Sequence, residues 1–476
     1  MAQQNQRGPQ AGTTVGSVGS VGSTDAAAAV SPALDVAIID VAIIGGGIGG
    51  LVTALALHAA GIRCTVFESV PALRPLGVGI NLLPHSVRVL AALGLQPQLA
   101  ATAIETAALA FYNRHGQLIW SEPRGMAAGY AYPQFSIHRG ELQMLLLAAV
   151  RERLGDAAVR TGHVLERFVD EGDGDGDGDR DGDGDGDAIR LHFVDPHGAP
   201  REAVRARAVI AADGIHSVVR RHFHPDEGPP RFSGRLLWRG TCEGAPFLDG
   251  RTMIQAGHAH QKFVCYPISR ELADAGRSRI NWIAELSVAH DTPPRQDWSR
   301  RVDASIFREP FAGWRFDWLD VPALIDATDA IYEYPMADRD PLAGWTHGRI
   351  TLLGDAAHPM YPIGSNGASQ AILDAEAMAC ALVETGFASG GASGDRHPAK
   401  GFARYEATRR EATGQIVLGN RAGGPDQVMQ IAEERAPGGF AHIHDVIALT
   451  ELEAISARYK QLAGFSREQV NRPAPP

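Results

Sequence analysis

The sequence predicts an α/β fold with a Rossmann-like nucleotide-binding domain, an inserted β-sheet domain and C-terminal helices. Three observations predict it. The apolar run Val41 to Ile44 leads directly into the stretch GGGIGG and then into a helix-like segment. Residues 230–340 contain many short β-like runs, such as RLLWRGTC and RINWIAELS. The chain beyond Gly364 has the apolar spacing of helices.

The predicted parts follow from composition along the chain. Residues 1–34 are rich in Gly, Ser, Ala, Gln and Thr, which cannot bury enough surface to fold, so we expect a disordered tail. The expected nucleotide-binding domain is discontinuous, with strands near 41–44 and 64–68 and a helix near 49–60. Its two parts are residues 35–229 and 341–415, the sheet domain is 230–340, and the helical C-terminal segment is 416–476.

An acidic run interrupts the first part. Residues 171–187 alternate Gly and Asp, and such a run repels itself and offers nothing to pack. The flanking segments HVLERFVD and AIRLHFVD both have strand patterns, so we interpret the run as the tip of a hairpin. A calcium site is the alternative, but the mixed ligand pattern of a calcium loop is missing.

Composition excludes several classes of protein. The 476 residues are 45% hydrophobic and 21% charged, with a net charge of −11 and no basic stretch that would suit nucleic acid. No apolar run reaches the ~20 residues that cross a membrane. The four cysteines have no metal-ligand or redox spacing, which favours a cytoplasmic protein with reduced thiols.

The first motif is Gly45-x-Gly47-x-x-Gly50, placed between a strand and a helix. Glycines there allow a tight turn, close approach of a pyrophosphate and close packing of helix on strand. Glu68 ends the next strand, where a carboxylate can accept hydrogen bonds from ribose hydroxyls and would repel a 2′-phosphate. This favours FAD or NAD over NADP at this site.

Two further motifs also follow apolar strands. Asp213-Gly214 ends the strand in AVIAADGIHSVVRRHF, and Gly354-Asp355 ends the strand in RITLL. Asp355 could cap a helix, but the glycine before it and the Gly-Pro loop after it favour a binding role. We interpret His358 as a structural hydrogen-bonding residue, and no metal-ligand spacing is present.

The three motifs, in this order, resemble the p-hydroxybenzoate hydroxylase class of flavoprotein monooxygenases, in which they surround one FAD. The resemblance spans residues 41–413. Four stretches are similar to phenazine-modifying members of the class: RPLGVGINLLP, WSEPRG, YPQFSIHRGELQMLLLAAVRERLG and YPMADRDPLAGW.

The resemblance implies a role for each matching residue toward non-covalent FAD. The expected cofactor-binding residues are Gly45, Gly47, Ile48, Gly49 and Gly50 at the pyrophosphate, Glu68 and Ser69 at the adenosine ribose, Val78, Arg139 and Gln143 near the phosphate and ribityl chain, Asp213 and Gly214 bracing the site, and Gly354 and Asp355 at the ribityl hydroxyls. The expected border of the flavin ring is Pro362, Gly364, Asn366, Gly367 and Ala368.

The implied reaction uses NADH or NADPH, O2 and a C4a-hydroperoxyflavin to hydroxylate a planar aromatic, phenazine-like substrate. We assign no protein acid or base and no metal. The sheet domain is expected to form the substrate wall, with candidates Trp238, Arg239, Tyr266, Trp282 and Tyr334. Strand alternation places Phe263 and Cys265 on one face and Val264 and Tyr266 on the other, so only one set can face the substrate.

Two alternatives stay open at this point. One is a FAD oxidoreductase of the same fold that inserts no oxygen, and the other is a flavin-binding sensor without turnover. A plain NAD-dependent dehydrogenase would leave the Asp213 and Asp355 motifs unexplained. The assembly is left open between a monomer and a homodimer.

Overall fold

The first sheet begins with strand β1 (Ile39–Ile44), which runs into the glycine-rich turn and helix α1 (Ile48–Ala59). The computed structural model describes residues 38–172, 188–289, 300–387 and 397–472, so the predicted tail lies outside the described residues. Apolar residues form β1 apart from Asp40, and Val41 to Ile43 are fully buried. The predicted strand–glycine–helix unit is confirmed, with boundaries shifted by one or two residues.

The first sheet has eight strands, and its main path is β20-β21-β11-β1-β2-β8. Its central pairs, β21–β11, β11–β1 and β1–β2, are parallel, so their carboxyl ends meet at one edge. The antiparallel strands β9 and β10 confirm the predicted strands flanking the acidic run, of which residues 173–187 lie outside the described residues. The bounds are β2 (Cys64–Phe67), β8 (Val159–Arg160), β9 (Val164–Asp170), β10 (Ile189–Val194), β11 (Val204–Ala211), β20 (Thr346–His347) and β21 (Ile350–Leu352).

The second sheet also has eight strands, in the order β16-β19-β12-β15-β14-β13-β5-β6. Residues 230–340 supply most of it, while β5 and β6 come from a much earlier part of the chain, inside the predicted nucleotide-binding segment. The bounds are β5 (Ala108–Tyr112), β6 (Leu118–Pro123), β12 (Arg231–Gly244), β13 (Thr252–His258), β14 (Gln261–Pro267), β15 (Ser278–Ser287), β16 (Arg301–Val302) and β19 (Ile331–Asp338).

Two small sheets complete the strands. One has the order β3-β7-β4, and the other pairs β17 with β18. The bounds are β3 (Gly79–Leu82), β4 (Ile104–Glu105), β7 (Phe135–His138), β17 (Arg315–Phe316) and β18 (Leu319–Asp320).

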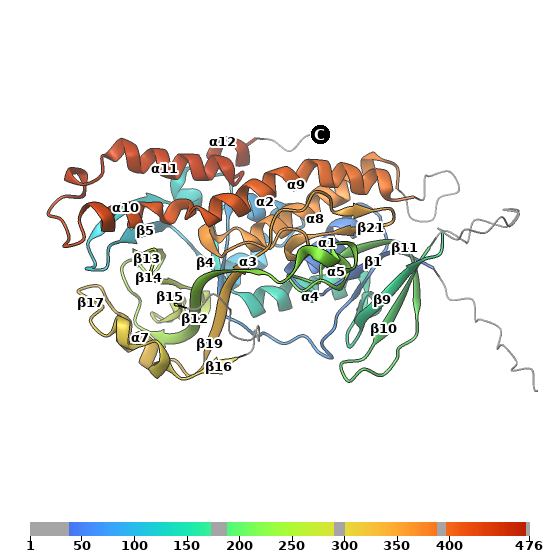
Figure 1. Ribbon diagram of the computed structural model, residues 1–476, viewed down its shortest axis with the longest axis horizontal. Coiled ribbons are helices and arrows are strands. Elements are labelled where there is room, and N and C mark those ends of the chain that lie inside the picture. Colours follow the sequence, from blue (N-terminus) through green and yellow to red (C-terminus); the bar gives the residue numbers. More distant parts are fainter. Residues whose placement is uncertain (1–37, 173–187, 290–299, 388–396, 473–476) are drawn as a thin grey trace, which may run out of the picture. The chain divides into compact units, whose positions relative to one another are not determined.

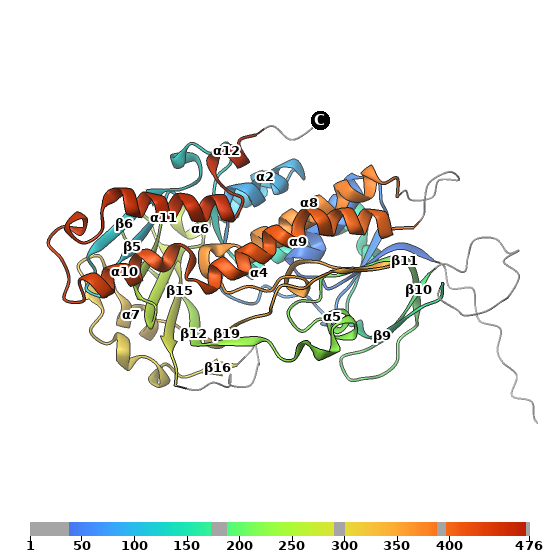
Figure 2. The same ribbon diagram turned by 45° about the horizontal axis from the view of Figure 1, so that its top comes forward.

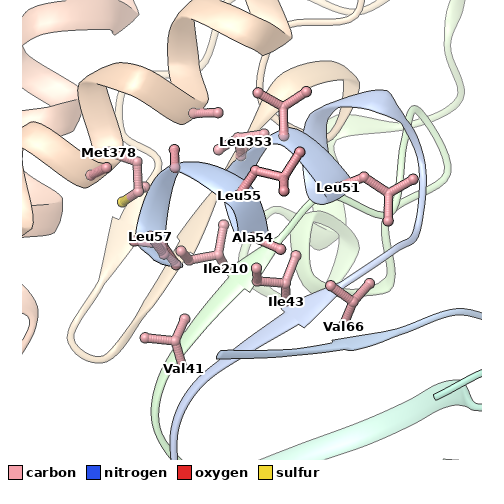
Figure 3. Packing of buried hydrophobic residues seen from close by; sticks show 14 of the residues in the cluster. Val41, Ile43, Leu51, Ala54, Leu55, Leu57, Val66, Ile210, Leu353 and Met378 are labelled. Atoms are coloured by element: carbon pink, nitrogen blue, oxygen red, sulfur yellow. The ribbon is translucent and has the colours of Figure 1, made fainter. Parts of the chain in front are cut away.

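The helices cover both sheets. Helix α1 packs against α4 and α8, and Figure 3 shows Leu51 and Leu55 of α1 among Val41, Ile210 and other core side chains. The bounds are α2 (Pro84–Ala92), α3 (Gln96–Thr102), α4 (Arg139–Leu154), α5 (Val218–Phe223), α6 (Arg270–Asp274), α7 (Val321–Asp326), α8 (Gly367–Glu384), α9 (Ala399–Arg421), α10 (Gln427–Arg435), α11 (Leu449–Leu462) and α12 (Arg467–Val470).

The C-terminal helices α10 and α11 lie over the second sheet. Both Figure 1 and Figure 2 place them beside β5 and its neighbours, and Val428 and Leu452 share one apolar cluster with Phe111 and Val264. The predicted helices are confirmed, although α9 continues across the predicted boundary at residue 416. In the described part of the chain, no helix combines the length and apolar character needed to cross a membrane.

Candidate functional site

The three sequence motifs meet at the carboxyl ends of the parallel strands. Gly45 has a φ of +107°, and a Cβ there would lie 2.4 Å from the carbonyl oxygen of Ala212, next to the Asp213 motif. A Cβ on Gly49 would lie 3.0 Å from the side chain of Leu353, beside the Gly354 motif. Both contacts require glycine or a shift of the neighbour, so the glycine loop is built into the other two motifs.

The glycine loop has the shape of an anion-binding turn. A Cβ on Gly50 would lie 2.0 Å from the carbonyl oxygen of Gly45, which locks the helix start against the turn. Space above Gly47 is open, since no atom lies within 4 Å of the position its Cβ would take. Ile48 begins α1 here, so backbone N–H groups at a helix start face the open side.

Glu68 and Gln143 hold the two peptide groups that flank Gly46. The Gly46 N–H donates to Glu68 Oε2 at 2.7 Å, and Gln143 Nε2 donates to the Gly46 carbonyl at 2.8 Å. Ser69 Oγ also donates to Glu68, at 2.9 Å. The Val70 N–H also donates to Glu68 Oε1, at 2.8 Å. These predicted residues therefore come together at the loop, where Glu68 braces the turn and keeps one lone pair on Oε2 for a ribose hydroxyl.

Asp213 and Gly214 lie at the end of β11. Asp213 Oδ2 accepts a hydrogen bond from the Val218 N–H at 2.9 Å, while its buried Oδ1 has no hydrogen-bond partner among the described residues. Burial raises the pKa of this carboxyl group. Gly214 follows with a φ of +80°.

Arg220 joins the second motif to the third, a role that sequence reasoning missed. It is 1% exposed, forms an ion pair with Glu227, and donates to the carbonyls of Ala356 and Ala357 at 3.0 and 2.8 Å. Its helical spacing after Asp213 was visible in the sequence, but its partners were not.

Asp374, which the sequence analysis did not single out, anchors the third motif. It accepts hydrogen bonds from the Gly354 N–H at 3.1 Å and from Arg409 Nε at 2.8 Å, and it contacts His358 Nε2 at 2.5 Å. Burial alone would raise the pKa of Asp374, but His358 and Arg409 outweigh it and hold the pKa at about 2. His358 therefore has the structural setting expected of a hydrogen-bonding residue.

Asp355 behaves differently from Asp374. It is exposed and accepts no hydrogen bond from the described residues. Desolvation nevertheless raises its pKa, against the charges of His358 and Arg139, because protein atoms surround it closely. The exposed Arg139, whose N–H donates to the Val78 carbonyl at 2.9 Å, lies close enough to act on it.

The loop after Pro362 packs closely against Tyr459 of helix α11. Gly364 has a φ of +68°, and a Cβ there would lie 1.9 Å from Tyr459 Oη. The fully buried Asn366 donates from Nδ2 to Tyr459 Oη at 2.8 Å and to the Gly364 carbonyl at 3.2 Å. Ser365 has a φ of 59°, which is unusual outside glycine. Tyr459, on α11, is a further residue that sequence reasoning missed.

Helix α8 begins at the end of this loop. Gly367 is its first residue, with no atom within 4 Å of the position of a Cβ, and Ala368 is half-buried. The start of α8 therefore presents backbone N–H groups on an open side, as a site that stabilises negative charge on a flat ring requires.

The second sheet turns one face, here called the inner face, toward this loop. Tyr266 and Leu237 on that face belong to one apolar cluster with Tyr361 and Ile363 of the loop. Phe263 and Cys265 lie in the cluster on the opposite, outer face, which confirms the predicted alternation along β14.

Three substrate-wall candidates lie together on the inner face. Arg239 Nη2 donates to the Gly79 carbonyl at 3.0 Å, and its guanidinium group lies 5.9 Å from the centre of the Tyr334 ring. Burial raises the pKa of Tyr266 to about 12, although the neighbouring Arg239 opposes this shift. Asn281 completes the group by accepting from the Gly79 N–H at 2.6 Å.

The other two candidates, Trp238 and Trp282, lie on the outer face. They are 4% and 0% exposed, and their indole N–H groups are already bonded, to Glu333 at 3.0 Å and to Thr328 at 2.8 Å. The pairing of β12 with β15 puts them in the core behind the sheet. This placement removes both tryptophans from the substrate wall.

The site fits FAD. The glycine turn suits a pyrophosphate, the unpartnered Asp355 carboxylate suits the hydroxyls of a ribityl chain, and the open start of α8 suits a flat ring. No group of histidine, cysteine and acidic side chains that could hold a metal occurs among the described residues. These features define a flavin-dependent oxidoreductase.

Comparison with known proteins identifies the family. The model of the FAD binding domain family matches residues 38–231 and 319–417, and the chain belongs to this family. It is 46% identical to "Phenazine 1,6-dicarboxylic acid hydroxylase PhzS" of Lysobacter antibioticus, over 90% of this chain and 98% of that one. It is 31% identical to a 3-amino-4-hydroxybenzoate 2-monooxygenase of Streptomyces platensis, over 87% and 96%. The chain is thus a FAD-dependent aromatic monooxygenase.

Solved structures share the fold at low sequence identity. A salicylate hydroxylase substrate complex aligns with a TM-score of 0.64 and 22% identity, covering 90% of this chain and 98% of that one. HpxO of Klebsiella pneumoniae, in complex with FAD and uric acid, aligns with a TM-score of 0.61 and 22% identity, covering 91% and 95%.

Proposed function

We propose that this enzyme hydroxylates a planar heteroaromatic, phenazine-like substrate, with NADH or NADPH as the electron donor. The observation that carries the proposal is the 46% identity to a phenazine hydroxylase over nearly the full length of both chains. The inner face supports it, since the half-buried Tyr334 is suited to stacking on a flat ring, and Arg239 is suited to an anionic or electron-rich edge.

Bound FAD would supply the oxidation–reduction chemistry that activates O2 with electrons from the nicotinamide. The residues that would hold it are the glycine loop with Glu68, Ser69 and Gln143, the Asp213 and Asp355 motifs with Val78 and Arg139, and the loop from Pro362 to Ala368. We propose these roles from the contacts described above.

The protein's own contribution is positioning and exclusion of water. The backbone at the start of α8 stabilises negative charge on the ring system. The inner face, covered by α10 and α11, keeps water from the reacting ring and orients the substrate. We assign no side chain as acid or base. The donor binds transiently, because the sequence has one complete Gly-x-Gly-x-x-Gly unit between a strand and a helix.

The cytoplasmic location and the homodimer stay predictions. The described structure adds that all four cysteines are free thiols. Size measurement of the purified protein in solution distinguishes monomer from dimer.

The test combines a spectrum with a product analysis. Purified protein should carry FAD or take it up, giving a flavin absorption spectrum. A panel of phenazine, quinolone and hydroxybenzoate acids is then supplied with NADH or NADPH in air. We expect a phenazine acid to stimulate NAD(P)H oxidation and O2 consumption and to yield an oxygenated product by mass spectrometry. Turnover confined to single-ring acids would contradict the proposed substrate class.

A further inference from the structure

A small buried pocket lies next to the loop from Pro362 to Ala368, here called the flavin-ring loop. It touches the loop at Gly364 and Ser365 and the inner face at Met253 and Gln255. The lining residues are Leu83, Leu109, Arg124, Gln134, Met253, Gln255, Gly364, Ser365, Pro425, Tyr459 and Phe465.

Three polar side chains of this pocket each have one buried atom without a hydrogen-bond partner among the described residues. Arg124, Gln134 and Gln255 are 7%, 2% and 4% exposed. Arg124 Nε, Gln134 Oε1 and Gln255 Oε1 are buried without a hydrogen-bond partner among the described residues. Each such group costs free energy when it is left unpaired. All three residues line one pocket beside the proposed site of reaction, which indicates that a bound ligand supplies the missing hydrogen-bond partners.

The charges around Arg124 are unbalanced. Arg124 forms a buried ion pair with Glu122, and Lys460 Nζ also lies 2.7 Å from Glu122 Oε2. Burial raises the pKa of Glu122, but Arg124 and Lys460 outweigh it and hold the pKa below its usual value, so the carboxylate stays ionised. Two cations against one anion leave an excess positive charge, which favours a second carboxylate.

We propose that this pocket binds the carboxylate of an aromatic substrate, with Arg124 as the charged partner and Gln134 and Gln255 as amide partners. A half-turn of each amide exchanges its oxygen and nitrogen, so both glutamines can donate N–H groups to the anion. This assignment rests on the proposed function. In it, Arg124 and the two glutamines select an aromatic acid over a neutral ring of the same shape.

The test measures binding separately from turnover. Full-length protein with FAD is titrated with a phenazine monocarboxylate and with the matching neutral carboxamide, and the change in flavin absorbance gives each Kd. Arg124→Gln should raise the Kd of the carboxylate by about 10- to 100-fold, because a charge-assisted contact is lost. The Kd of the carboxamide should change by less than about threefold, as its contacts with the pocket are uncharged.

Arg308→Gln is the matched control, since Arg308 pairs with Asp326 and does not line the pocket. It should change neither Kd. Gln255→Leu is the second variant, because it leaves the Arg124–Glu122 pair intact. It should raise the Kd of the carboxylate by about three- to tenfold while FAD stays bound.

Equal effects of Arg124→Gln on both ligands, or no effect of Gln255→Leu on the acid, would overturn the pocket assignment. The two proposals fail in different ways. Wild-type protein that binds the acid selectively without oxygenating it supports the pocket and refutes the proposed substrate. Wild-type protein that oxygenates the acid, with Arg124→Gln unchanged in Kd and KM, refutes the pocket alone.

Discussion

Asn366 of the loop from Pro362 to Ala368 donates a hydrogen bond to Tyr459 Oη at 2.8 Å, so the C-terminal helix α11 holds a loop that lies almost a hundred residues earlier. Tyr459 Oη also lies 2.8 Å from Asn420 Oδ1 on α9. The hydroxyl group is buried and central to this network, so its removal leaves Asn420 Oδ1 without its donor and Asn366 Nδ2 with the Gly364 carbonyl as its remaining acceptor.

Tyr459→Phe should therefore lower the free energy of unfolding by about 1–3 kcal/mol. It should also weaken FAD binding, because the loop loses its support. Urea unfolding and FAD titration measure both. Tyr112→Phe is the control, since the Tyr112 ring packs at a tilt against Trp318, with ring centres 4.3 Å apart, and forms no hydrogen bond through its hydroxyl among the described residues. It should stay within about 0.5 kcal/mol of wild type.

Gly364→Ala should be more damaging than its size suggests. The positive φ disfavours alanine, and the new methyl group would overlap Tyr459 Oη. We expect a loss of more than about 1 kcal/mol in stability and a marked fall in turnover, measured by thermal unfolding and by NADH oxidation. Gly313→Ala, at an open position without positive φ, should leave both unchanged. Normal turnover in Gly364→Ala would refute the claim that turnover depends on the close packing of Gly364 against Tyr459.

Asp355→Ala should weaken FAD binding without changing the stability of the folded apoprotein. Because no described residue donates to this carboxylate, its loss should leave the apoprotein's unfolding midpoint nearly unchanged. FAD affinity should fall by about 10- to 100-fold, since hydrogen bonds to a charged acceptor are lost. Fluorescence titration of FAD into apoprotein measures this. Intact affinity and turnover would show that Asp355 does not hold the cofactor.

Asp374 predicts a definite dependence of stability on pH. Its pKa is lowered from 3.8 to about 2, so the unfolded state binds the proton more readily between these values. Stability from this group is complete above pH ~4 and is lost as the pH falls toward ~2, a change of roughly 2 kcal/mol. Urea unfolding of wild type and Asp374→Asn should show a gap at pH 6 that narrows on acidification. A gap that stays constant with pH would contradict this.

Local features of the fold were predictable because each has a local cause. Gly45 to Gly50 signal a phosphate turn, and the apolar strands before Asp213 and Gly354 place those motifs at one sheet edge. Their meeting across about 300 residues came from the family resemblance, since strand order is a tertiary property. The second sheet was recognised from its β-like runs, but nothing in the local pattern of β5 and β6 signals that they join it.

Side-chain placement in the site was only partly predictable. Alternation separates Val264 from Phe263 but does not say which face meets the loop from Pro362 to Ala368, so the candidates included Trp238 and Trp282, which lie on the outer face. Asp374, Arg220 and Tyr459 act through partners far along the chain, and their residue types alone carry no signal of that. Domain boundaries stay predictions for the same reason, because contacts rather than composition set them.

The most direct test of the central claim is the origin of the oxygen atom in the product. Purified enzyme with FAD, NADH and a phenazine acid is placed under O2 of a heavy isotope, and the product mass is measured. We expect a product that carries one heavy oxygen atom from O2. A product whose new oxygen comes from water, or NADH oxidation with no oxygenated product, would contradict it.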